Sequence, residues 1–146
     1  MVLPADENKD VLRVERSGKR IQQMSDTIEL NTTRINTLPL TFCDEYHHHW
    51  PRANELDEYL GTATKKWTLL AEQKRNYTNI IHLAEKNPDL GVDVMGMKKR
   101  LIECQGQMEE VESVIQCLRE RIYNINVAAA KKQHENNNRL LNNRGK

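Results

Sequence analysis

The strongest pattern in the chain is a run of apolar side chains that alternate at four- and three-residue spacing in its last third. Spacing of this kind places the side chains along one narrow side of a helix. Such a seam buries poorly against its own chain and well against another long helix, so we expect it to bind partner helices. The run consists of Leu90, Val94, Met97, Leu101, Cys104, Met108, Val111, Ile115, Leu118, Ile122, Ile125 and Ala129.

Two earlier segments carry the same spacing more weakly. In the first, Val14, Ile21, Ile28 and Ile35 recur every seven residues, although polar residues share the seam. Together the patterns predict helices over about 8–37, 53–86 and 89–130. In the middle segment the seam positions are Leu56, Leu60, Ala63, Trp67, Leu70, Lys74, Tyr77, Ile81 and Ala84.

Prolines mark the breaks between these helices, because proline removes a backbone donor and clashes with the preceding turn. The seam before Pro88 does not continue in phase after it. Asn87 is predicted to cap the third helix, with Pro88 at its first position and Asp89 near its positive end. We expect a turn or sharp kink here, after which the third helix either folds back on the second or continues at an angle.

These breaks predict an all-α, elongated coiled-coil protein of about three helices, interrupted near Pro39–Pro51 and at Pro88. The tail is rich in Asn, a poor helix former, so it is expected to fray. The expected parts are an N-terminal amphipathic helix (1–38), a linker (39–52), a coiled-coil region (53–130) and a polar tail (131–146).

Composition narrows the classes of partner and compartment. Only 38% of the 146 residues are hydrophobic, and the net charge is +1. A balanced charge argues against a nucleic-acid partner and gives no support for attraction to a membrane surface. No apolar stretch approaches the roughly 20 residues that span a bilayer. The acidic N-terminus does not resemble a signal peptide. The three cysteines imply no disulfide framework. We therefore expect a cytoplasmic protein without direct membrane insertion.

Candidate chemistry is sparse. Cys43 and His47–His49 are the one cluster with metal-ligating side chains, but consecutive histidines point in different directions, so a solvated linker is favoured over a zinc site. No phosphate-binding loop, nucleophile elbow or HExxH motif occurs. We expect no enzyme activity, cofactor, metal or small-molecule substrate.

The seam itself is the predicted site. Glu112 flanks it and is expected to pair with a cation of a partner helix. The predicted partner-binding positions are Trp67, Leu70, Tyr77, Ile81, Leu90, Val94, Met97, Leu101, Cys104, Met108, Val111, Ile115, Leu118, Ile122 and Ile125.

The segment from about Asn76 to Leu118 resembles the dysbindin family. The likeness includes an acidic run at a fixed distance from the proline, a tryptophan that opens the region, and a Tyr-x-x-x-Trp pair upstream. It rests on Tyr46, Trp50, Trp67, Pro88, Leu90, Asp93, Met97, Leu101, the Glu109–Glu112 run and Leu118.

This resemblance implies a scaffold subunit of the hetero-oligomeric complex for biogenesis of lysosome-related organelles, with roles in endosomal sorting and synaptic vesicle function. Its partners would be other small helical subunits, and its location would be peripheral to endosomal or vesicle membranes. An alternative resemblance, carried by the spacing of Arg75, Tyr77, Pro88 and Asp89, is to a coiled-coil subunit of the THO messenger-RNA export complex.

Overall fold

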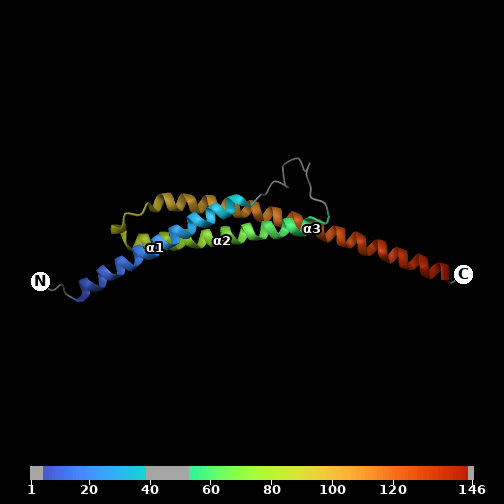
Figure 1. Cartoon of the computed structure of the whole chain (residues 1–146), viewed down its shortest axis with the longest axis horizontal. Coiled ribbons are helices and arrows are strands. Elements are labelled where there is room, and N and C mark those ends of the chain that lie inside the picture. Colours follow the sequence, from blue (N-terminus) through green and yellow to red (C-terminus); the bar gives the residue numbers. More distant parts are fainter. Residues whose placement is uncertain (1–4, 39–52, 145–146) are drawn as a thin grey trace.

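The described part of the chain consists of three long helices, with no strand among its residues (Figure 1). The structure is a computed structural model and describes residues 5–38 and 53–144. The helices are α1 (Ala5–Thr37), α2 (Leu56–Lys86) and α3 (Val94–Arg144), and a 3-10 turn, η1 (Pro88–Leu90), precedes α3. The predicted all-α fold is confirmed. The linker at 39–52, with Cys43 and His47–His49, lies outside the described residues.

Consecutive helices run in opposite directions (Figure 1), and both α1 and α3 pack on α2. The end of α1 reaches the first half of α2, where Lys66 Nζ donates to the carbonyl of Leu38 at 3.2 Å. Two ends extend beyond this three-helix body: the start of α1 at one end and the last part of α3 at the other (Figure 1). The molecule is therefore elongated.

Proline does end α2, but the cap of α3 is not the predicted one. The side chain of Asn87 donates back to the carbonyl of Leu83 at 2.9 Å, so it closes α2. Gly91 then reverses the chain with a left-handed φ of 67°. The carboxylate of Asp93 accepts from the backbone N–H of Gly96 at 3.0 Å and caps α3. A Cβ at position 96 would approach that carboxylate closely, so a larger residue there would require the Asp93 side chain to shift.

Because of this turn, α3 folds back along α2, and the seam of α3 is covered within its own chain. Leu118 and Val111 are almost fully buried, as are Leu56 and Leu70 on α2. The expectation that this seam would bury poorly against its own chain is wrong. The reason is that the turn at Pro88 brings α3 back alongside α2 in the opposite direction. The face of α2 that α3 then meets is also apolar.

Helix α1 covers a second face of α2. Ile21, Ile28 and Ile35, the sevenfold repeat of the sequence, are all buried there. Their polar companions Ser17 and Asn31 are buried as well, at 7% and 2% exposure. The buried face of α1 is therefore continuous along the helix, although it contains polar as well as apolar side chains.

Helix α3 continues well past its predicted end near residue 130, since it remains helical to Arg144. The expected fraying of the tail is not observed. From Asn126 to Asn143, however, every side chain is exposed. This segment, which we call the α3 extension (residues 126–144), has no cover from the described part of the chain.

Candidate helix-binding surfaces

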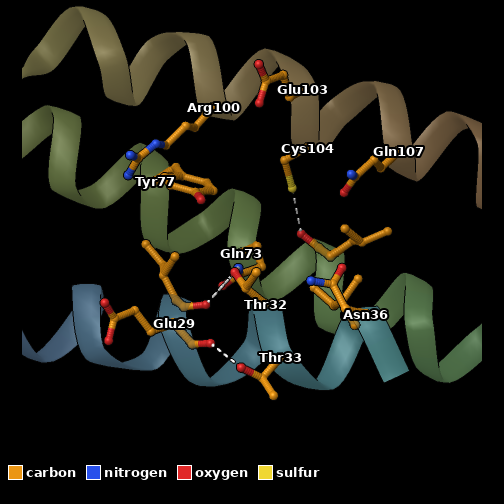
Figure 2. A pocket seen from close by; sticks show the side chains of 13 residues that line it. Glu29, Thr32, Thr33, Asn36, Gln73, Tyr77, Arg100, Glu103, Cys104 and Gln107 are labelled. Carbon is orange, nitrogen blue, oxygen red and sulfur yellow. Dashed lines mark hydrogen bonds between the residues drawn. The ribbon is translucent and has the colours of Figure 1, made fainter. Parts of the chain in front are cut away.

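The first candidate surface is a groove of about 630 Å³ between α1 and α3, with α2 as its floor (Figure 2). It exists because both outer helices pack on α2 and leave space between each other. Leu70, Gln73 and Tyr77 form the floor, and Glu29 and Glu103 stand on the two rims. A groove with an apolar and amide floor and polar rims has a form that a fourth amphipathic helix could occupy.

Gln73 is the most unusual side chain of this groove, because it is a buried amide that is only partly satisfied. Its Nε2 donates to the carbonyl of Ile28 at 3.1 Å and to Oγ1 of Thr32 at 3.0 Å, so it connects α2 to α1. Its Oε1 is buried without a hydrogen-bond partner. An unpaired buried acceptor is costly, so Gln73 weakens the packing of α1 on α2 at this point.

Burial shifts the pKa values of two side chains in this groove, Cys104 and Tyr77. Burial raises the pKa of the Cys104 thiol, and Lys74 opposes the shift only in part. The thiol donates to the carbonyl of Leu70 at 3.3 Å. Burial likewise raises the pKa of the Tyr77 hydroxyl, against the influence of Arg100. A protonated thiol is a poor nucleophile, so the structural role of Cys104 is to pack and to donate a hydrogen bond.

A second groove, of about 610 Å³, lies between α2 and α3 where Trp67 approaches the middle of α3. The indole Nε1 of Trp67 donates to Oε1 of Glu112 at 2.9 Å. Ile115 lies beside the indole, and Gln116 and Glu120 line the side formed by α3. This groove combines an apolar floor with acidic and amide side chains.

The third surface is the α3 extension. It presents the aliphatic side chains of Val127, Leu140 and Leu141 to solvent. Lys131, Lys132 and Arg139 outnumber Glu135 along it. The last side chains of α3 that pack on α2 are Ile122 and Ile125, which join the cluster around Leu56.

The predicted partner-binding residues divide into two groups in the structure. Those that are only partly buried keep some surface open, and their role in partner binding stays a prediction. The buried ones are Leu70, Tyr77, Ile81, Cys104, Met108, Val111 and Leu118, and the partly buried ones are Trp67, Leu90, Val94, Met97, Leu101, Ile115, Ile122 and Ile125.

The sequence pattern missed the face of α2 that packs on α1. Ile80 is fully buried and Gln73 is 3% exposed, whereas Lys74, placed in the predicted seam, is exposed. A helix between two neighbours needs a wider apolar face than one seam. The run Leu70, Gln73, Tyr77, Ile80 and Ala84, again at three- and four-residue spacing, was the available signal.

No protein-family model, curated protein or solved structure matches this chain. Within residues 5–38 and 53–144, no three His, Cys, Asp or Glu side chains gather as metal ligands would. None of the described helices is both long and apolar enough to cross a membrane.

Proposed function

We propose that this protein is a non-enzymatic scaffold subunit that binds long helices of other proteins in a hetero-oligomeric complex. The observation that carries the proposal is the α3 extension, a helix of 19 residues that leaves the body with every described side chain exposed. Most of the stability of a helix in a protein comes from tertiary packing, which this segment lacks within the described part of the chain. Asn136, Asn137 and Asn138 weaken this one further, so a partner helix would stabilise it.

The groove between α1 and α3 supports the same proposal. Its two walls come from helices that both pack on α2 and do not close over it. A helix docked there would contact the exposed side chains of both rims and would complete a four-helix arrangement. The groove and the α3 extension are far apart along the molecule, so one chain can hold two partner helices.

The family resemblance makes the proposal more specific. We infer a role in an assembly for endosomal sorting, lysosome-related organelle biogenesis and synaptic vesicle function, where the protein would be cytoplasmic and peripheral to endosomal or vesicle membranes. Long helices that bury one face internally and leave another open suit such a subunit. A role in nuclear messenger-RNA export is the alternative.

The decisive experiment is affinity purification of the tagged full chain, followed by mass spectrometry and hydrogen exchange on the recovered complex. We expect stoichiometric helical partners and slowed exchange of the amides in the α3 extension. Seam substitutions such as Leu101→Asp are unsuitable, because they would disrupt packing of α3 on α2. The double variant Leu140→Asp/Leu141→Asp changes only exposed side chains and should lose partners that bind the extension, while Met95→Asp is a matched exposed control.

The localisation of the tagged chain separates the two cellular roles. Endosomal puncta favour trafficking, and nuclear speckles favour messenger-RNA export. Recovery of the chain alone, with unchanged exchange in the α3 extension, would contradict the scaffold proposal.

A further inference from the structure

The near-zero net charge of the chain conceals a cationic stripe on the first part of α1. Lys9, Arg13, Arg16 and Arg20 follow one another at four-, three- and four-residue spacing and are all exposed. They border a surface hollow of about 510 Å³ together with Leu12, which is 50% exposed. Arg13 has an ion pair with Asp10 at 3.7 Å, but both side chains are well exposed, so this pair is weak.

A stripe of equal length that carries mainly negative charge runs along the middle of α3. It consists of Glu109, Glu112, Gln116 and Glu120, all exposed. Both stripes extend over 11 residue steps, or about 16 Å of helix. Glu112, Gln116 and Glu120 line the second groove, whose floor contains Trp67 and Ile115.

We propose that the cationic stripe of α1 docks along the Glu109–Glu120 stripe of a second copy of this chain, with the two helices antiparallel. The alignment that brings Lys9 beside Glu120 also brings Arg20 beside Glu109, because the two stripes have equal length. Arg16 then faces Glu112, and Arg13 faces the amide of Gln116. Leu12 lies above the apolar floor of the groove. The proposal does not depend on the scaffold function.

The direction of the helices allows this contact to form twice. Helices α1 and α3 run in the same direction within one copy (Figure 1). A second copy that is inverted by a two-fold axis therefore presents its α1 antiparallel to the first copy's α3, and the reverse contact forms by symmetry. Arg119, on the same rim of the groove, is the one charge among its lining residues that opposes the contact.

A second copy is favoured over a membrane or a nucleic acid for two reasons. An anionic surface would attract the cations but would not require their helical spacing, whereas the stripe on α3 matches that spacing. The described part of α1 also has no aromatic side chain on which bases could stack, and only one aliphatic residue, Leu12, lies within the cationic stripe.

The test is sedimentation velocity on the full chain at low and high salt with charge-reversed variants. Wild type should form a dimer that weakens as salt rises. Arg20→Glu and Glu109→Arg should each weaken dimerisation by about tenfold, since each breaks two symmetric pairs and creates repulsion. The double variant Arg20→Glu/Glu109→Arg should restore it. Arg34→Glu, an exposed reversal outside the stripe, is the matched control, and circular dichroism confirms that every variant is folded.

Several outcomes would overturn the proposal. One is a wild-type chain that stays monomeric at about 100 μM in low salt, well above the range in which a specific dimer of this kind should form. Another is a double variant no better than either single one. If wild type is monomeric but floats with phosphatidylserine vesicles, or shifts an RNA probe, and Arg20→Glu abolishes this, the stripe serves that ligand instead of a second copy.

Discussion

The indole of Trp67 and the carboxylate of Glu112 are joined by a hydrogen bond of 2.9 Å that crosses from α2 to α3. The two residues lie 45 positions apart in the sequence. The sequence pattern predicted that Glu112 would pair with a cation of a partner, and the structure shows that this carboxylate also has a donor within its own chain. This contact joins the face of α2 that carries Trp67 to the middle of α3.

This hydrogen bond should have a measurable coupling energy. We expect Glu112→Ala to lower the free energy of unfolding by about 0.5 kcal/mol, because the indole N–H loses its protein acceptor at an exposed site where water replaces it in part. In a Trp67→Phe background, the same substitution should have little effect. Urea denaturation followed by circular dichroism measures both, and strictly additive effects would show that the contact contributes nothing to stability.

Leu118 should be among the most sensitive positions of the chain. Its side chain is fully buried against Leu56 and Ala63. Leu118→Ala removes buried methyl groups and leaves a cavity, so we expect a loss of about 2–5 kcal/mol. Leu140→Ala, in the α3 extension, makes the same chemical change at an exposed site and should cost less than about 0.5 kcal/mol. Equal losses in thermal or urea denaturation would contradict the described packing.

Asn31 should be a site where an apolar residue increases stability. It occupies a seam position of α1, is 2% exposed, and its Nδ2 has no hydrogen-bond partner. Asn31→Leu removes an unsatisfied buried amide, so we expect a gain of about 1 kcal/mol. Asn79→Leu, on the exposed side of α2, is the control and should change little. A lower melting temperature for Asn31→Leu would mean that the amide is satisfied in solution.

The cap of α3 can be located by substitution. Asp93→Ala removes the acceptor for the N–H of Gly96 and should cost about 1 kcal/mol, whereas Asp93→Ser should retain most of the stability. Asp89→Ala tests the cap region that the sequence suggested and should have a smaller effect. Denaturation curves that rank Asp89→Ala as the more harmful change would support the sequence-based assignment.

Stability should fall in alkaline solution. Burial raises the pKa of the Cys104 thiol and of the Tyr77 hydroxyl, so the folded state holds both protons more tightly than the unfolded state does. The stability that these groups contribute is therefore complete below their unfolded pKa values and is lost as pH rises through the folded ones. For Cys104 the loss should begin above about pH 8.5. We expect Cys104→Ala to have a shallower decline than wild type between about pH 8 and 10. An unchanged slope would show that the thiol does not contribute.

The existence of the helices and the identity of most buried positions follow from local chemistry, so the sequence alone determined them. Ile21, Ile28 and Ile35 recur at a helical period, and the same holds for Cys104, Val111 and Leu118. Each set therefore shares one side of its helix whatever lies opposite. The break at Pro88 is equally local, because a missing N–H and a ring clash act within one turn.

What covers each seam was decided only by the tertiary structure. Hydrophobic burial has no direction, so a seam on α3 can pack equally well on α2 or on a foreign helix. The turn at Gly91 placed α2 against the seam of α3. The packing of α1 on a second face of α2 then buried Ile80 and Gln73 and left Lys74 exposed. In the same arrangement, no described helix covers the α3 extension. These outcomes depend on the relative placement of whole helices, which periodicity along one chain does not contain.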